Sequence, residues 1–416
     1  MTHNSICGIV ELIFGFKILK FNQTENKRTE SIECEKRLTK MQVCAPFLKH
    51  RPAWALAGFG VRRSFASRPA RRVLLPAPGP PSSFVNETVE PGSSETVLGD
   101  REVEVQVAAC AVAYRDIIDR TGGFPFMNQP TVLGHEFSGR VTRAGASSSL
   151  QEGDRVVSLH WAQYDQEAWP APFGHKDAMK TFLGLTCDGG YQDYVTTHET
   201  AFVKVPNPEF LTGVEAAPAM STFGTVWQGA VVRGGLRRNE RVLVTGAAGG
   251  VGSAAVCMAA RLGAHVIGTT GSVDAKQEYI KSLGAAEVIS AEKGFSKQLG
   301  RGNLVDMVIE NVGAPTFTDS LRSLKPGGRL VLIGNVTNEA VSLPLGLCIL
   351  NSLSVIGTDS IEGSELEKMF LWMEKEGLKP SIDHVLPLEQ AAKAHEMIEE
   401  RAVNGRIVLD VNSSIW

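Results

Sequence analysis

The chain has 416 residues, of which 43% are hydrophobic and 21% are charged, which is typical of a globular protein with two or three domains. Its formal net charge of -3 gives no indication of nucleic-acid binding. Seven cysteines without a Cys-x-x-Cys pair argue against a disulfide scaffold or a clustered-thiolate metal site, and no apolar run is long enough to span a membrane.

The N-terminal part has the composition of a targeting segment. Residues 36–86 contain ten Lys or Arg and no Asp or Glu, as is typical of mitochondrial transit peptides. Five Glu precede Met41, so we predict that translation begins at Met41. We expect an N-terminal extension at 1–70, a transit segment at 41–67 and a mitochondrial location. The alternatives are a flexible basic tail and a cytoplasmic location.

Short β runs broken by Gly and Pro follow, up to about Val205. They predict a closed or partly closed antiparallel β structure. The predicted strands are Arg72–Pro76, Glu102–Ala108, Phe137–Arg143, Arg155–Leu159 and Tyr191–Thr196.

From about Leu211, strands alternate with helices, which predicts right-handed βαβ units in a doubly wound parallel sheet. The predicted strands are Arg241–Thr245, His265–Thr270, Val305–Asn311 and Arg329–Gly334. The predicted helices between them are Val251–Leu262, Ala275–Leu283 and Thr316–Leu324. Two helices, Glu365–Lys375 and Leu388–Glu399, and a final strand, Arg406–Val411, are predicted to complete the chain.

A glycine-rich turn between the first of these strands and its helix predicts a dinucleotide site. Gly249 and Gly250 would let the backbone approach a pyrophosphate, and Gly252 would let the helix pack closely on the strand. Ala247 departs from the strict G-x-G-x-x-G pattern. The candidate cofactor-binding residues of the turn are Gly246, Ala248, Gly249, Gly250, Val251 and Gly252.

The end of the next strand indicates which dinucleotide binds. An NAD site has an Asp or Glu there for the ribose 2′-OH, whereas this chain has Thr270 and Ser272 and no acid before Asp274. Small hydroxyl side chains leave room for a 2′-phosphate, and Lys276 could complete its pocket. We therefore predict NADPH rather than NADH.

Several further motifs occur in a fixed order between residues 72 and 411. They are Ala109–Asp116, Gly134–Gly139, Gly153–Val157, Asp188–Tyr191 and Leu332–Asn335. Together they resemble the medium-chain dehydrogenase/reductase superfamily, which includes zinc alcohol dehydrogenases and zinc-free quinone and enoyl reductases. The resemblance implies a GroES-like β-barrel domain at 71–208 and 358–416, interrupted by a Rossmann domain at 209–357. The cofactor would lie between them. Gly334 and Asn335 follow a predicted parallel strand, where ligands of such sheets bind, so we predict that they contact the nicotinamide.

The same resemblance indicates that the metal has been lost. The catalytic zinc of the alcohol dehydrogenases is held by two Cys and one His, and these positions correspond here to Ala113, Ser221 and His135. Cys110 is three residues from the lost ligand, and an odd offset on a strand points it to the other face. Glu136 or Asp116 could add an oxygen ligand, but one imidazole without the two thiolates is too few for catalytic zinc, so we predict no metal site.

Without a Lewis acid, reduction of an activated double bond or a quinone is easier than alcohol oxidation. The candidate catalytic residues are Tyr114, Arg115, Asp116 and His135. Tyr114, Arg115 and His135 are possible hydrogen-bond donors to a developing oxyanion, and Tyr114 is also a possible proton donor. Alternatively, Tyr114 is a packing residue, Arg115 and Asp116 form a bracing ion pair, and His135 is an inert remnant.

Three functions are therefore open. The first is a zinc-independent NADPH-dependent reductase of enones, enoyl thioesters or quinones, acting on a small, hydrophobic, electrophilic substrate. The second is an alcohol or aldehyde dehydrogenase with a degenerate zinc site. The third is a non-catalytic NADPH-binding protein. The family resemblance also predicts a homodimer or homotetramer.

Overall fold

The computed structural model describes residues 69–90, 97–124, 127–163 and 180–416. The predicted transit segment at 41–67 lies outside these ranges. No helix within them combines the length and the apolar character needed to cross a bilayer.

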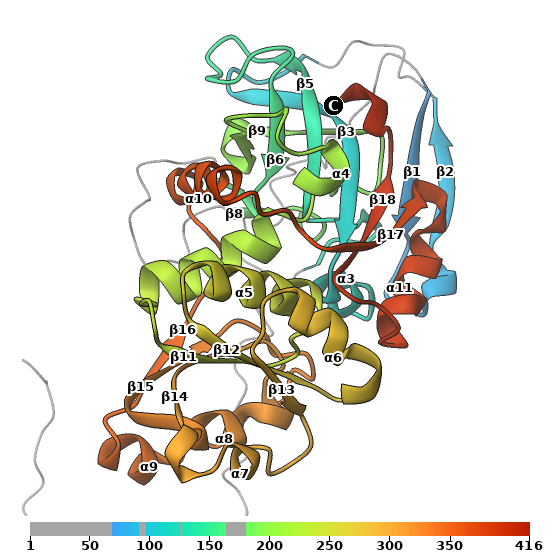
Figure 1. Cartoon of the computed structure of the whole chain (residues 1–416). Helices are drawn as coiled ribbons and strands as arrows, with labels where there is room; N and C mark the ends of the chain where they lie inside the picture. Colours follow the sequence, from blue (N-terminus) through green and yellow to red (C-terminus); the bar gives the residue numbers. More distant parts are fainter. Residues whose placement is uncertain (1–68, 91–96, 125–126, 164–179) are drawn as a thin grey trace, which may run out of the picture. The chain divides into compact units, whose positions relative to one another are not determined.

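Two β sheets of the first section carry the predicted antiparallel strands (Figure 1). A three-stranded sheet contains β2 (Val85–Val89), β1 (Ala70–Leu75) and β4 (Thr131–Val132). A seven-stranded sheet contains β10 (Phe202–Lys204), β6 (Arg155–Ser158), β5 (Phe137–Ala144), β3 (Glu102–Val112), β9 (Tyr194–His198), β18 (Arg406–Asp410) and β17 (Ile382–Pro387). Strands β7 (Trp161–Gln163) and β8 (Lys180–Phe182) form a separate pair. The C-terminal strands thus return to the first β section.

Strand β3 is the centre of the larger sheet, because it pairs with β5, β9 and β18. Its valines at 103, 105 and 107 are fully buried in the main β core. At its C-terminal end, Ala109 and Ala111 pack with Ala217 and Val408. Small side chains at this point let the short helix α4 (Gly213–Ala216) lie close to the sheet.

A six-stranded parallel sheet forms the second section. Its order is β13 (Glu287–Ser290), β12 (His265–Thr270), β11 (Arg241–Val244), β14 (Val305–Glu310), β15 (Leu324–Leu332) and β16 (Ser354–Gly357). Helices α5 (Gly250–Arg261) and α6 (Val273–Ser282) cover one face, and α7 (Ser296–Leu299), α8 (Ala314–Arg322) and α9 (Leu345–Leu350) lie on the other (Figure 1).

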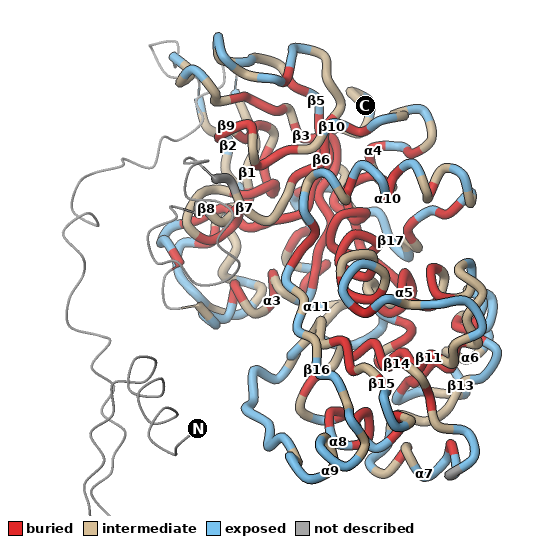
Figure 2. Tube along the Cα trace, turned by 90° about the vertical axis from the view of Figure 1, so that its left-hand side faces the viewer, coloured by how far each residue is buried: buried red, intermediate tan, exposed pale blue. Residues whose placement is uncertain are grey.

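Alternation along the strands explains the two helical layers. On β11, Val242 and Val244 belong to the core cluster that includes α5, whereas Leu243 packs in the cluster that includes Phe317 of α8. Figure 2 shows buried positions along the central strands and exposed positions around α9. The predicted combination of a doubly wound Rossmann sheet and a GroES-like β domain is confirmed.

The remaining differences from the sequence prediction lie in weakly patterned segments. The edge strands β13, β16 and β17 were not predicted, because their residues are mostly half-buried or exposed and show no clear alternation. Two π-helical segments, Met220–Gly224 and Trp227–Arg233, precede β11. Helices α10 (Gly363–Glu376) and α11 (Ala391–Glu399) follow the sheet, and Leu388–Gln390 is a 3-10 turn rather than the start of α11.

Candidate active site

The carboxyl ends of the parallel strands form the cofactor edge of the site. The strand order reverses between β11 and β14, and ligands of doubly wound sheets bind outside such a point. The predicted cofactor-binding residues lie at the ends of β11, β12 and β15, in the loops that follow them, and in the first turns of α5 and α6.

The glycine-rich turn has the geometry of an anion site. Gly246 has φ of +58°, a left-handed conformation that favours glycine, and Gly249 is the N-cap of the 12-residue helix α5. A Cβ at Gly249 would meet nothing nearer than 3.5 Å, so the approach to this helix end is open. The first N–H groups of α5, including those of Gly250 and Val251, therefore offer positive potential to a pyrophosphate.

Gly252 has a packing role. A Cβ at this position would lie 2.8 Å from Cα of Ala247 and closer still to the carbonyl oxygen of Gly246. The glycine thus lets α5 approach the end of β11. Ala248 ties the turn to the C-terminal strand, because its carbonyl accepts from Gly405 N at 2.8 Å.

The predicted ribose edge carries hydroxyl groups and a lysine. Thr270 is buried, and its Oγ1 accepts from the backbone N–H of Ser272 at 3.3 Å. The Lys276 ammonium donates to the carbonyls of Arg401 and Val403, both at 3.1 Å. Burial lowers the pKa of Lys276, and nearby Asp383 opposes this effect. Lys276 therefore fastens α6 to the segment before β18, and its contact with a 2′-phosphate stays a prediction.

A buried carboxylate that was not predicted organises the other loops. Glu310, at the end of β14, accepts from Thr245 Oγ1 at 2.8 Å and from the backbone N–H groups of Val312 and Gly313 at 2.9 and 3.0 Å. It also accepts from Thr316 at 2.7 Å and from Ser320. This acid joins the end of β11 to the loop after β14.

The predicted nicotinamide contacts lie at the same edge. Gly334 N donates to the Glu310 carbonyl at 3.1 Å, and a Cβ at Gly313 would meet Cα of Asn335 at 2.8 Å. The Asn335 amide donates to the carbonyl of Glu339 at 3.3 Å. The loops after β14 and β15 are therefore in direct contact.

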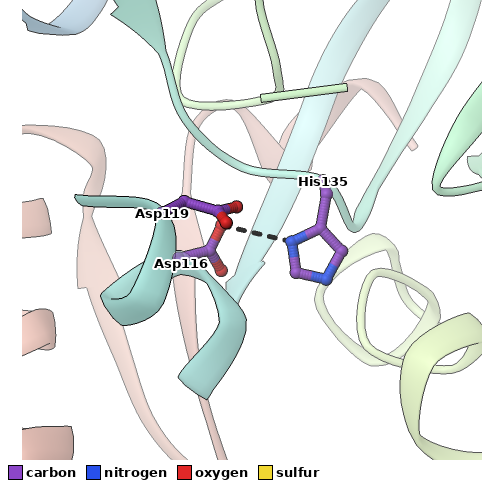
Figure 3. Close-up of side chains that lie close together, drawn as sticks. All are labelled: Asp116, Asp119 and His135. Carbon is purple, nitrogen blue, oxygen red and sulfur yellow. Dashed lines mark hydrogen bonds and ion pairs between the residues drawn. The ribbon is translucent and has the colours of Figure 1, made fainter. Parts of the chain in front are cut away.

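The predicted catalytic residues come from helix α3 (Tyr114–Arg120) and the loop before β5. Asp116 and His135 are buried, and Asp116 Oδ1 lies 3.2 Å from His135 Nδ1 (Figure 3). Asp116 Oδ2 accepts from Ala113 N at 2.8 Å. Burial alone would raise the pKa of Asp116, but His135 and the Ala113 N–H hold it below its usual value. Burial lowers the pKa of His135, although Asp116 opposes this effect.

The alternative ion pair between Arg115 and Asp116 is wrong. Arg115 pairs instead with Asp119, one helical turn further on, with Nε 3.4 Å from Oδ2. Neighbouring side chains on a helix diverge, whereas residues four apart face each other. Burial raises the pKa of Asp119 to about 8 despite Arg115. Tyr114 is 39% exposed at the start of α3, so it is not a core residue.

The donor set does not fit the zinc site of this fold. Ala113 offers a methyl group, and the Ser221 hydroxyl donates to Glu136 and accepts from Arg406 Nη2 at 2.7 Å. Among the described residues, one cluster of three possible ligands lies within 4.8 Å, and it consists of Asp116, Asp119 and His135 (Figure 3). In this cluster the guanidinium of Arg115 lies against Asp119, and its positive charge opposes cation binding. The Cys110 thiol donates to the Glu136 carbonyl at 3.3 Å and is not available either.

Arg406 connects the side chains of Ser221 and Glu136 to the glycine-rich turn. Its guanidinium lies 3.2 Å from Glu136, and a Cβ at Gly250 would lie 2.9 Å from its Cζ. Its Nε is buried and has no hydrogen-bond partner in the described part of the chain. Burial raises the pKa of Glu136 to about 8, although Arg406 lowers it. A buried cation with an unused donor beside a helix N-terminus fits a pyrophosphate.

The comparisons agree with this geometry. Residues 99–207 match the alcohol dehydrogenase GroES-like domain model, and residues 250–375 match the zinc-binding dehydrogenase model. Acryloyl-coenzyme A reductase of Sulfurisphaera tokodaii is 33% identical over 336 residues, which is 80% of this chain and 98% of that protein. The chain therefore belongs to the medium-chain dehydrogenase/reductase superfamily and is an NAD(P)-dependent oxidoreductase.

Two solved structures support the assignment. The crystal structure of AibC is 32% identical, with a TM-score of 0.74, covering 84% of this chain and 99% of that one. A crystal structure of an NAD-dependent alcohol dehydrogenase is 31% identical, with a TM-score of 0.71, covering 82% and 99%. Similar proteins thus include both reductases and alcohol dehydrogenases.

Proposed function

We propose that this enzyme is a zinc-independent, NADPH-dependent reductase of activated C=C bonds, with quinones as the next class of acceptor. The observation that carries the proposal is the state of the pocket around Ser221. Its hydroxyl is engaged by Glu136 and Arg406, and Ala113 offers no ligand, while the nucleotide turn next to them is complete. A reaction that needs hydride but no Lewis acid fits such a site.

Enoyl thioesters are the acceptor class that we favour. The Sulfurisphaera relative bears the name of a reductase of an unsaturated acyl-coenzyme A, and 98% of that protein is matched by this chain. In an enoyl thioester, hydride addition at the β-carbon moves negative charge onto the carbonyl oxygen. Hydrogen-bond donors can stabilise that charge without a metal.

Residues of α3 would hold the substrate beside His135. Tyr114 is exposed enough to reach a ligand and carries a phenol, which is a possible proton donor. The side chain of Arg115 is 23% exposed and lies over the Phe124 ring, 6.0 Å from its centroid. It adds positive potential next to His135. Bound NADPH would supply the hydride.

NADPH is proposed rather than NADH because the end of β12 carries no carboxylate. The chain there presents Thr270 and Ser272, and Lys276 lies one turn into α6. A carboxylate at this place would repel a 2′-phosphate, and its absence removes that barrier.

A homodimer is proposed from the exposed edge of the parallel sheet. β16 is the last strand of the sheet, and α9 beside it exposes Leu345, Ile349 and Leu350 by 64%, 74% and 86%. An open strand edge with adjacent exposed apolar side chains fits pairing with a second copy across a two-fold axis. A mitochondrial location remains a proposal from the composition of residues 41–67.

The experiment is a cofactor-oxidation screen on the purified chain. NADPH and NADH are compared with crotonyl-coenzyme A, enones, quinones and aldehydes, and bound zinc is measured on the same sample. The proposal expects NADPH oxidation with the unsaturated acceptors and no stoichiometric zinc. Aldehyde reduction that requires zinc would support the dehydrogenase alternative. NADPH binding without any turnover would support the non-catalytic alternative.

A further inference from the structure

A second histidine lies against His135. His160 follows β6 and precedes β7, and its ring centroid is 4.9 Å from that of His135, with the two planes at 61°. The carbonyl of His160 accepts from Leu183 N at 3.1 Å, which fixes the backbone at this point. The imidazole is therefore held beside His135 from a different element of the β domain.

The Nε2 atom of His160 lacks a protein partner. It is buried from solvent and has no hydrogen-bond partner within the residues that the structure describes. Buried polar side-chain atoms are almost always hydrogen-bonded, because desolvation without a partner costs free energy. The unused atom beside His135 therefore indicates a polar atom of a ligand.

The surrounding charges indicate what kind of atom this is. The guanidinium groups of Arg115 and Arg406 and the ring of His135 are the groups whose charge acts on His160. The two guanidinium groups that oppose an imidazolium favour an electron-rich oxygen at the same place.

His135 cannot take this role in its neutral form. Asp116 is a carboxylate and can only accept, so Nδ1 of His135 carries the ring proton. Nε2 of His135 then keeps a lone pair and accepts hydrogen bonds rather than donating them. A donor to a substrate oxygen must come from another side chain, and His160 is placed to provide it.

We propose that Nε2–H of His160 binds the carbonyl oxygen of the substrate and stabilises the negative charge that this oxygen acquires during reduction. This inference rests on the proposed function. Hydride addition forms a C–H bond at the β-carbon, and the π electron pair of the C=C bond shifts onto the carbonyl oxygen. A solvent-derived proton then bonds to the α-carbon and the carbonyl reforms. The acceptor is reduced by two electrons, and the dihydronicotinamide is oxidised.

The test uses the full chain and three variants. His160→Phe removes the donor, and His160→Gln keeps an N–H donor. His265→Gln is the matched control, because His265 is 40% exposed at the opposite end of β12 and pairs with Glu287. Turnover is measured with NADPH and crotonyl-coenzyme A. A second measurement does not depend on turnover. The ¹⁵N imidazole signal of His160 is assigned as the signal that is missing in His160→Gln. Its chemical shift is then followed while butyryl-coenzyme A is added.

The expected result is a loss of about 100-fold in kcat for His160→Phe, at least tenfold recovery in His160→Gln, and no change in the control. The His160 signal should move on addition of butyryl-coenzyme A, which tests the contact even if His160→Phe does not fold. If the wild type turns over and the kcat of His160→Phe is within twofold of the wild-type kcat, the inference is overturned and the proposed function stands. No turnover by the wild type but a shifted His160 signal would overturn the proposed function and the catalytic role of His160, and would leave only the contact between His160 and the acyl thioester. No turnover and no shift would overturn both.

Discussion

The packing of helix α5 on strand β11 can be tested with Gly252→Ala. The new Cβ would lie 2.8 Å from Cα of Ala247, whereas ordinary contacts begin at 3.4 Å, so α5 must move by at least about 0.6 Å. The obstructing atoms are backbone atoms and cannot rotate away. Overpacking of this kind costs about 1–3 kcal/mol, and the same movement displaces the N–H groups that would bind the pyrophosphate. We expect a melting temperature lower by roughly 3–10 °C and NADPH binding at least tenfold weaker.

Gly249→Ala separates packing from ligand contact. Its φ of -79° suits alanine, and the added Cβ would meet nothing nearer than 3.5 Å. This variant should melt like the wild type but bind NADPH more weakly, because its methyl group stands where the phosphates approach. Thermal unfolding and quenching of tryptophan fluorescence by NADPH measure the two effects. Wild-type melting and affinity in Gly252→Ala would refute the reasoning, as would unchanged affinity in Gly249→Ala.

Four further predictions follow from individual contacts. Ser272→Asp should weaken NADPH binding at least tenfold while sparing NADH, as measured by fluorescence titration; an unchanged ratio of the two dissociation constants would contradict the assigned ribose edge. Ala113→Cys combined with Ser221→Cys should restore a three-ligand set with His135 and bind zinc detectable by elemental analysis; a metal-free double variant would show that the positions do not converge. Because the pKa of Asp119 is about 8 in the folded protein, the folded state holds a proton there that the unfolded state releases above about pH 4. The free energy of unfolding of the wild type should therefore fall as pH rises from about 4 to 8, by at most about 1.4 kcal/mol per pH unit. Asp119→Asn should lack this fall. Denaturant unfolding of both proteins across this pH range measures the effect. The same dependence of unfolding free energy on pH in the two proteins would contradict the prediction. Ile349→Lys should convert a dimer to monomers in light scattering, and a wild-type monomer or a dimeric variant would count against the α9 interface.

The local motifs of the site were predictable from the sequence because their geometry is local. The glycine-rich turn predicted the start of α5, since a strand, a turn and a helix follow one another within a few residues. Asp116 and His135 were identified as site residues through the family resemblance, and the structure shows their side chains 3.2 Å apart. Arg115 was assigned the wrong partner because the helical start at Tyr114 was not recognised.

Residues that act across the fold could not be predicted in this way. Arg406 is brought beside Gly250 by the return of β18 to the first β section, and no sequence pattern links the two. The same holds for the carbonyl groups that bind Lys276, which precede β18. A weak signal existed for Glu310, because an acid at the end of an otherwise apolar strand must find buried donors. His160 could not be identified from the sequence, because its proposed role depends on the missing hydrogen-bond partner of Nε2 among the described residues.

Zinc content, measured together with activity on one preparation, tests the central claim most directly. The enzyme is purified without chelator, and zinc per chain is determined by elemental analysis before and after treatment with a strong chelator. We predict far less than one zinc per chain and NADPH-dependent reduction of crotonyl-coenzyme A that is unaffected by the chelator. One zinc per chain, with activity that is lost on chelation and restored by zinc, would contradict the account.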